Sequence, residues 1–144
     1  MRRYCEPVDP ARTYRTRQGV YGIVCDGTDL LVTEQADPGP EIQLPGGGID
    51  PGEGALQALH RECLEETGWT IRVIRRLGAF QRFAYMPDYG LWARKVCHIY
   101  LARPALRRGD PRDPGHRALW MPATTAARLL GNAGDRAFLA RLVP

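Results

Sequence analysis

Residues 47–69 read GGIDPGEGALQALHRECLEETGW, and this stretch holds four of the seven glutamates of a chain of 144 residues. A helix turns about 100° per residue, so a helix through this stretch places Glu62, Glu65 and Glu66 on one face. Like charges at these spacings repel by about a few tenths of a kcal/mol per pair, so the cluster favours a bound counter-charge. A divalent cation supplies that charge, and a set of oxygen ligands favours Mg²⁺ first and Mn²⁺ second.

The other positions of the predicted helix suit a helix that packs on a core. Leu56, Leu59 and Cys63 form an apolar stripe that we expect to dock the helix. Ala55 and Ala58 flank the carboxylates and leave room for a metal and a phosphate. The alternative interpretation is a solvated acidic helix face, which is the usual meaning of two or three clustered glutamates.

The stretch resembles the Nudix box, G-x5-E-x7-R-E-U-x-E-E-x-G-U, in which U is a bulky aliphatic residue. Every charged position and both flanking glycines match, and the residues 44–48, LPGGG, precede the box as in most family members. Cys63 and Trp69 replace aliphatic residues, which changes the packing behind the helix but removes no ligand. The completeness of the match disfavours the solvated acidic face, and a looser resemblance covers roughly residues 17 to 130.

This resemblance implies an α/β fold, the Nudix-type α/β/α sandwich with a mixed β-sheet. It also implies metal-dependent hydrolysis of a pyrophosphate linkage in a nucleoside diphosphate derivative. Arg61 would orient the carboxylates, and the residue that takes the proton of the attacking water stays open. Relatives use either the glutamate that matches Glu62 or a residue of a later loop, where the candidates are Asp88, Asp113 and His116. The implied metal ligands are three glutamates, a glycine carbonyl and a supporting glutamate: Glu62, Glu65, Glu66, Gly46 and Glu53.

The identity of the substrate stays open among nucleoside triphosphates, dinucleoside polyphosphates and ADP-ribose. Relatives that cleave ADP-ribose often carry a proline where this chain has Ala84, and those that cleave diadenosine polyphosphates often carry a tyrosine near the position of Tyr85. We expect the segment of Tyr85, Asp88, Tyr89 and Trp92 to border the substrate, because aromatic faces stack on bases. A regulatory Nudix module that binds a nucleotide without turnover is the alternative, but such modules usually lose box glutamates.

Length and composition predict one domain over residues 1–144, with an N-terminal extension at 1–15. An apolar content of 44% is ordinary, and no run of sequence is long and apolar enough to be a membrane span or a signal peptide, so we expect a cytoplasmic protein. The four cysteines form no C-x-x-C pair, which disfavours zinc. Cys25 and Cys63 lie in apolar patterns and are expected to be packing residues.

A net charge of +4 comes almost wholly from arginine, because Lys95 is the single lysine. We find no basic motif interleaved with aromatic residues, and therefore expect a small nucleotide as partner and no long nucleic acid. Whether the chain forms a homodimer stays open.

Strand and turn patterns outside the helix follow the order of an α/β/α sandwich. Gly68 suits the C-cap of the helix, and residues 37–40 and 103–116 read as loops. A further loop is predicted at 83–91, between two aliphatic and aromatic strands. Strands are predicted at 16–25, 30–34, 70–82, 95–102 and 119–122, and further helices at 124–130 and after 135.

Overall fold

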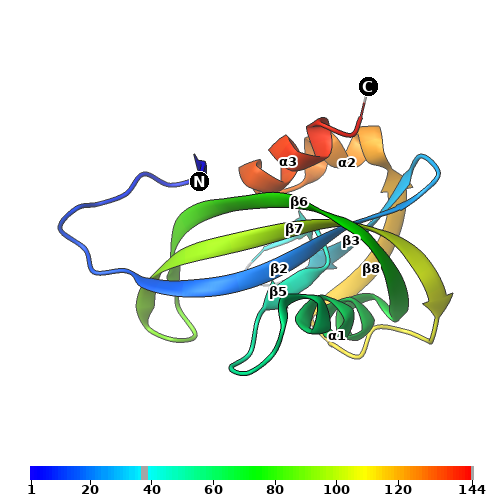
Figure 1. Cartoon of the computed structure of the whole chain (residues 1–144), viewed down its shortest axis with the longest axis horizontal. Coiled ribbons are helices and arrows are strands. Elements are labelled where there is room, and N and C mark those ends of the chain that lie inside the picture. The colour runs from blue at the N-terminus through cyan, green and yellow to red at the C-terminus, as the bar shows by residue number, and fades with distance from the viewer. Residues whose placement is uncertain (37–38, 144) are drawn as a thin grey trace.

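A computed structural model of the chain describes residues 1–36 and 39–143. The predicted loop at 37–40 falls partly on residues 37 and 38, which lie outside the described residues. The described part folds into a curled mixed sheet with α1 against one face and α2 and α3 against the other (Figure 1). The elements are β1 (Arg3–Tyr4), β2 (Arg15–Asp26), β3 (Asp29–Gln35), β4 (Glu41–Gln43), β5 (Gly46–Gly48), α1 (Ala55–Thr67), β6 (Trp69–Met86), β7 (Leu91–Arg107), β8 (His116–Pro122), α2 (Ala123–Leu129) and α3 (Ala133–Ala140).

The sheet is built around β2, which explains why this strand carries a nearly continuous apolar run. β2 pairs in parallel with β7, from Arg15 opposite Ala93 to Val24 opposite Ala102, and antiparallel with β3 and β5. Along the sheet the order is β1-β6-β7-β2-β3-β4, while β8 pairs with β3. A strand covered by helices on both faces buries alternate side chains on each side, so both sets are apolar.

Two hydrophobic clusters form the core, one on each face of the sheet. Ile23 and Phe80 of the sheet pack with Phe138 and Leu139 of α3 on one face. On the other face, Val20 and Val24 of β2 pack with residues of α1, namely Leu59 and Cys63. This arrangement confirms the predicted α/β/α sandwich. No helix among the described residues has both the length and the apolar content that crossing a membrane requires.

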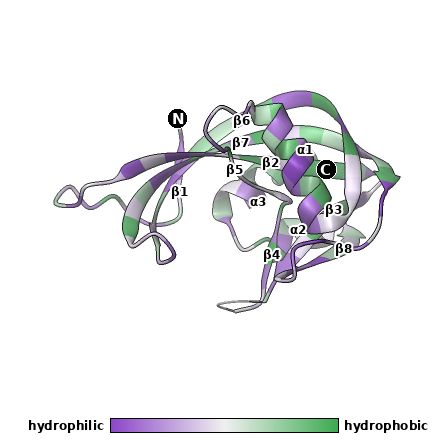
Figure 2. Cartoon of the chain, turned by 90° about the horizontal axis from the view of Figure 1, so that it is seen from below, coloured by the Kyte–Doolittle hydropathy of each residue, from purple (hydrophilic) through white to green (hydrophobic). Residues whose placement is uncertain are grey.

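The helix α1 forms where predicted, and Leu59 and Cys63 of its predicted apolar stripe are fully buried, but Leu56 is not. Gly68 caps it in the left-handed conformation with φ 76°, and its amide donates to the Leu64 carbonyl. Leu56, predicted to pack, is 45% exposed, whereas Ala58 is fully buried. Ala58 lies four and eight residues before Glu62 and Glu66, so the side of the helix that carries these glutamates faces the sheet. Hydrophilic and hydrophobic bands consequently alternate along α1 (Figure 2).

Two predicted loops are instead parts of long strands. Residues 83–91 were expected to form a loop, but Phe83 pairs with Arg94 and Met86 with Leu91, so that β6 and β7 form one hairpin with a turn at 87–90. The aromatic residues of this segment favour strand pairing over a loop, and Gly90, at φ 60°, closes the turn. The predicted loop at 103–116 begins only after Arg107, because β7 continues beside the start of β6. The short strand at 119–122 and the last two helices lie close to their predicted positions.

Candidate metal and pyrophosphate site

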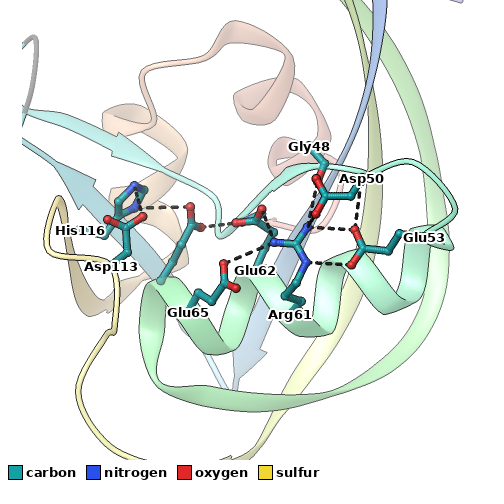
Figure 3. A network of polar contacts seen from close by, with 10 residues as sticks. Gly48, Asp50, Glu53, Arg61, Glu62, Glu65, Asp113 and His116 are labelled. Carbon is teal, nitrogen blue, oxygen red and sulfur yellow. Dashed lines mark hydrogen bonds and ion pairs between the residues drawn. The ribbon is translucent and has the colours of Figure 1, made fainter. Parts of the chain in front are cut away.

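Arg61 is the centre of a network that holds three glutamates (Figure 3). Its Nε and Nη2 donate to both carboxylate oxygens of Glu53, at 2.8 and 2.9 Å. Its Nη1 donates to Glu62 at 3.0 Å and lies 3.4 Å from Glu65. The carbonyl oxygen of Gly48 accepts a further hydrogen bond from Nη2 at 3.2 Å. Arg61 therefore fixes the glycine loop and the carboxylates of α1 relative to each other.

Glu53 is the glutamate that the arginine neutralises most completely. The two hydrogen bonds from Arg61, together with the Asp50 amide, lower the pKa of Glu53 to about 2. Glu53 precedes α1 and its carboxylate turns toward Arg61, so it acts on the helix through this pair rather than as a residue of the first turn. This position suits the supporting role that the sequence predicts for Glu53.

The glycine run of β5 lies directly against the carboxylates of α1. The Gly46 amide donates to Glu66 Oε1 at 2.9 Å. A Cβ at Gly46 would overlap the Val20 carbonyl, and a Cβ at Gly47 would lie 2.7 Å from the carboxyl carbon of Glu62. Only glycines allow this close approach of backbone and carboxylates. The predicted role of the Gly46 carbonyl as a ligand stays a prediction.

Glu66 lies at the inner end of the site, with its side chain 9% exposed. Burial raises the pKa of Glu66 to about 8 against its ordinary value of 4.5, and the neighbouring carboxylates of Glu62, Asp113 and Glu65 act in the same direction. Among the described residues no arginine or lysine lies within ion-pair distance of Glu66. Burial also raises the pKa of Glu62, which is 17% exposed, although Arg61 opposes the shift.

The segment that leads into β8, together with the first residue of that strand, brings Asp113 and His116 to Glu66. The amides of Arg112 and Asp113 donate to the Glu65 carbonyl at 2.8 and 3.1 Å, which docks this segment on the end of α1. His116 Nδ1 then lies 3.5 Å from Glu66 Oε2, and His116 Nε2 lies 3.5 Å from Asp113 (Figure 3). Within the described part of the chain, the buried Nδ1 of His116 has no hydrogen-bond partner. Ligand atoms of Glu66, Asp113 and His116 all lie within 4.8 Å of one another.

The donor chemistry of this site fits a hard divalent cation. Glu62 and Glu66 offer carboxylate oxygens that face the glycine loop, and the Arg61 guanidinium is already shared with Glu53. No arginine or lysine of the described residues lies within ion-pair distance of Glu66, and its burial beside other carboxylates raises its pKa. An oxygen-rich site with surplus negative charge suits Mg²⁺ or Mn²⁺.

The residues of the predicted substrate segment are divided between different places. Asp88 lies in the turn at the tip of the β6–β7 hairpin, away from α1 (Figure 1). Tyr85 and Trp92 pack on each other with ring centroids 5.2 Å apart, on the outer part of that hairpin. Tyr89 lines a cavity of about 230 Å³ together with Gly47 and Gly48. Of this segment, Tyr89 is therefore the residue that the fold brings toward the glycine loop.

Sequence reasoning missed a polar cavity of about 260 Å³ that adjoins Glu66 and Gly46. Arg82 and Lys95 line it from β6 and β7, and Asn132 and Asp135 line it from the start of α3. These residues are far apart in the sequence and share no motif. The single lysine in a chain rich in arginine was the one available signal. The further lining residues are Tyr21, Gln35, Glu41, Gln43, Leu44, Cys97 and His116.

In this cavity, Arg82, Lys95 and Asp135 form no ion pair with one another within the described part of the chain. Asp135 is 6% exposed, and burial raises its pKa to about 7. Burial lowers the pKa of Lys95. Within the described residues, the buried Nε of Arg82 makes no hydrogen bond, and neither Arg82 nor Lys95 forms an ion pair. These side chains can form hydrogen bonds to a polar ligand without first breaking ion pairs within the protein.

Comparison with known proteins identifies the class to which this fold and site belong. The family model described as NUDIX domain matches residues 15–142. The structure is similar to that of a NUDIX hydrolase from Nitrosomonas europaea, with a TM-score of 0.74 and 18% identity over 89% of this chain and 88% of that chain. The chain therefore belongs to the NUDIX domain family, and its fold is the one that MutT-like members share.

Two curated relatives resemble parts of the chain. One is a Bacillus subtilis (strain 168) protein provisionally named 8-oxo-dGTP diphosphatase, 35% identical over 52% of this chain and 50% of the relative. The other is the CMP-5'-(N-acetyl-N-hydroxy-3-aminopropyl)phosphonate hydrolase of Streptomyces rubellomurinus (strain ATCC 31215), 38% identical over 61% of this chain and 41% of the relative. The matches thus span half or less of the length of these relatives.

Proposed function

We propose that this chain hydrolyses a pyrophosphate linkage in a nucleoside diphosphate derivative and requires Mg²⁺, with Mn²⁺ as a substitute. Water adds to one phosphorus, the P–O bond of the anhydride breaks, and the bridging oxygen leaves with the other phosphate. Both relatives have names that describe hydrolysis of a nucleotide derivative, which supports the reaction type. The candidate substrates are nucleoside triphosphates, dinucleoside polyphosphates and ADP-ribose.

The observation that carries this proposal is the contrast between Arg61 and Glu66. Arg61 neutralises Glu53 and holds Glu62 and Glu65 in place, whereas Glu66 is buried without a cation among the described residues. A bound divalent ion would neutralise phosphate charge and lower the pKa of its bound water. Glu62, Glu65 and Glu66 would hold that ion, and the contacts of the glycine loop with Glu62 and Glu66 would keep these carboxylates in place against the phosphates.

We propose two candidates for the group that accepts the proton of the attacking water, Glu62 and His116. Glu62 lies against the glycine loop, and the unpartnered Nδ1 of His116 points toward Glu66. Asp113 lies 3.5 Å from the other ring nitrogen and can orient the imidazole. Comparing Glu62→Gln with His116→Gln separates these roles, because removal of the base costs kcat more than KM.

We further propose that the nucleoside enters the polar cavity lined by Arg82, Lys95, Asn132 and Asp135. This cavity begins at Glu66, so a nucleoside held there presents its phosphates to the α1 carboxylates. The mixture of donors and acceptors suits the polar edge of a base. Tyr89, on the other side of Gly47, is the stacking residue of the predicted segment that remains within reach of the glycine loop.

A hydrolysis screen tests the proposal directly. Nucleoside triphosphates, dinucleoside polyphosphates, ADP-ribose and nucleotide sugars would be incubated with the protein and Mg²⁺ or Mn²⁺, and the products identified by chromatography. We expect turnover of at least one class, with loss of turnover on chelation. Tight binding of a nucleotide with no turnover of any class would instead favour the non-catalytic regulatory module.

A further inference from the structure

A mainly apolar cleft lies on the α2 and α3 side of the sheet, apart from the site at Glu66. Its volume is about 370 Å³, and it shares no lining residue with the cavities at Glu66 and at Tyr89. The turn between β2 and β3, the start of α2 and the end of the chain after α3 form its walls (Figure 1). The apolar part of the lining comes from Cys25, Pro122, Ala123, Leu139, Leu142 and Val143.

Backbone hydrogen bonds hold the walls of this cleft in place. The Ala123 amide donates to the Thr28 carbonyl at 2.8 Å and ties α2 to the turn between β2 and β3. The Leu142 amide donates to the Leu139 carbonyl at 2.9 Å and fixes the end of the chain. Leu139 is fully buried, whereas Leu142 keeps 36% of its surface exposed. Since an apolar cavity of about 150 Å³ already holds a molecule of the size of benzene, this cleft has room for an alkyl chain.

Arg103 lies beside the cleft, next to Cys25. β2 and β7 run parallel with Val24 opposite Ala102, so Cys25 and Arg103 follow at the next position and point to one face of the sheet. That face is the one covered by α2 and α3, because Leu30, the antiparallel partner of Cys25, packs in the cluster on that side. Arg103 is also close enough to Cys25 to oppose the rise in the pKa of the thiol that burial causes.

A second arginine extends the positive charge at the edge of the cleft. Arg72 of β6 lies directly opposite Arg103 of β7, and both are exposed. Like charges in such a pair destabilise a sheet, and neither arginine forms an ion pair within the described part of the chain. Asp26 and Asp29 of the nearby turn pair with each other, one position beyond Cys25, and therefore point to the opposite face. The two arginines thus favour an anion from outside as their counter-charge.

We propose that this cleft binds a single-chain anionic amphiphile, with its alkyl tail against Leu139 and Leu142 and its carboxylate at Arg103 and Arg72. Guanidinium groups hold carboxylates through charge-assisted hydrogen bonds, and burial of the tail adds the hydrophobic contribution. Neighbouring strands are about 4.8 Å apart, so a carboxylate at Arg103 leaves the tail beside Cys25. The site is independent of the proposed function, because it takes a different class of ligand in a different part of the fold.

A series of alkanoates of increasing length tests the cleft. Isothermal titration with hexanoate to dodecanoate, each below its micelle concentration, should show a single binding site. We expect Kd to fall roughly threefold to fourfold per added methylene until the tail fills the cleft, and then to stay constant. Decanol, which lacks the charge, should bind about tenfold more weakly than decanoate. Absence of binding, or equal affinities for decanol and decanoate, would overturn the proposal.

Paired variants test the role of the arginine. Arg103→Gln should raise Kd for decanoate about tenfold and leave the affinity for decanol unchanged. Arg76→Gln is the matched control, because Arg76 lies opposite Tyr100, which packs on the α1 side of the sheet. This variant removes the same charge from the other face and should keep the original affinity. Equal losses in the two variants would show that decanoate responds only to net charge, and would overturn the site.

Cys25 reports occupancy in the unmodified protein, so this readout does not depend on the folding of a variant. Saturating decanoate should slow the reaction of Cys25 with a maleimide, measured by mass spectrometry of peptides, while the exposed Cys5 reacts at the same rate. Equal rates at Cys25 with and without decanoate would contradict the proposal. Sedimentation with anionic phospholipid vesicles is the last arm. Binding to vesicles without binding of monomeric decanoate would assign the arginines to a membrane surface and overturn the cleft as a site for a single chain.

Discussion

Glu53 and Glu66 lie on either side of Arg61 in the sequence, yet the fold gives them opposite electrostatic surroundings. Glu53 accepts two hydrogen bonds from the guanidinium, which help to lower its pKa to about 2. Glu66 is buried beside other carboxylates, and its pKa is raised to about 8. One glutamate is thus stabilised as an anion by the protein, and the other has no arginine or lysine partner among the described residues.

We propose that this difference separates a positioning residue, Glu53, from a cation-binding residue, Glu66, within one motif. A charge already paired with arginine contributes position, whereas an unpaired buried charge contributes affinity for a ligand of opposite sign. The sequence pattern does not distinguish Glu53 from Glu66, so only the surroundings of each side chain in the fold separate the two roles. Five predictions test that distinction.

The largest effect is expected for the carboxylates that lack a full partner. Glu65→Gln and Glu66→Gln should each lower turnover at least about a hundredfold, on the order of 3 kcal/mol of transition-state stabilisation. Steady-state kinetics at saturating Mg²⁺ measures this, and Glu6→Gln, at an exposed position, is the control. Near-normal activity of both variants would remove the basis for a cation at Glu66.

Stability without metal should depend on pH with opposite slopes for the two glutamates. The folded protein keeps a proton on Glu66 that the unfolded chain has released, so this group lowers stability as pH rises from about 4.5 to about 8, by on the order of a few kcal/mol. Glu53 is already ionised in the folded state, so its contribution is present above pH 4.5 and is lost as pH falls toward 2.

Denaturant titrations in the presence of a chelator check these slopes. Glu66→Gln should make the stability curve less steep between pH 4.5 and 8, and the slope that remains comes in part from Asp135, whose pKa burial also raises. Added Mg²⁺ should likewise reduce the slope of the original protein. A curve for Glu66→Gln as steep as that of the original protein would show that another group carries the charge.

Replacing Arg61 should change both the surroundings of Glu53 and the positions of the α1 carboxylates, because Arg61 bonds to Glu53, Glu62 and Glu65. Arg61→Lys keeps the charge but loses the forked hydrogen bonds to Glu53, so kcat/KM should fall by about tenfold to a hundredfold, or about 2 kcal/mol. The melting temperature should also fall. Arg72→Lys, exposed on β6, should change neither value. Equal activity of Arg61→Lys would show that charge alone is required.

Cys63 tests whether the sheet-facing side of α1 is mainly a packing surface. Cys63 is fully buried between Glu62 and Glu66 on that side, and burial strongly raises the pKa of its thiol. Cys63→Ala should cost about 1 kcal/mol of unfolding free energy with kcat unchanged. Cys25→Ala should cost less, since Cys25 is only partly buried. Loss of turnover by alkylation of either thiol in the folded protein would contradict the packing role.

The smallest effect is expected in the hairpin, for which we propose a role in substrate selection and none in binding the cation. Tyr89→Ala should change the ratio of kcat/KM for two accepted substrates with different bases about threefold to tenfold, while the Mg²⁺ requirement stays the same. Tyr85→Ala, on the outer part of the same hairpin, should change it less. An unchanged ratio in Tyr89→Ala would leave these aromatic residues with packing roles and move selectivity to Arg82, Lys95 or Asp135.

The sequence by itself determined the helix, its glutamates and the class of fold. These features depend on the spacing of residues along one helix and on one continuous sequence motif. Both can be recognised without knowing which distant residues are in contact. The limits of the hairpin were not predictable in this way, because the pairing of Phe83 with Arg94 depends on register across two strands. On α1 the predicted burial of Leu59 and Cys63 is confirmed and that of Leu56 is wrong, because Leu56 and Ala58 differ in burial only once the sheet is in place.

Only the tertiary structure decided which polar residues share the site. His116 and Asp113 reach Glu66 because their segment docks on the Glu65 carbonyl, and Arg82, Lys95 and Asp135 meet because two strands and a helix converge there. The unequal pKa values of Glu53 and Glu66 have the same origin. Burial and charge neighbours are properties of three-dimensional packing, whereas spacing along a helix is already present in the chain.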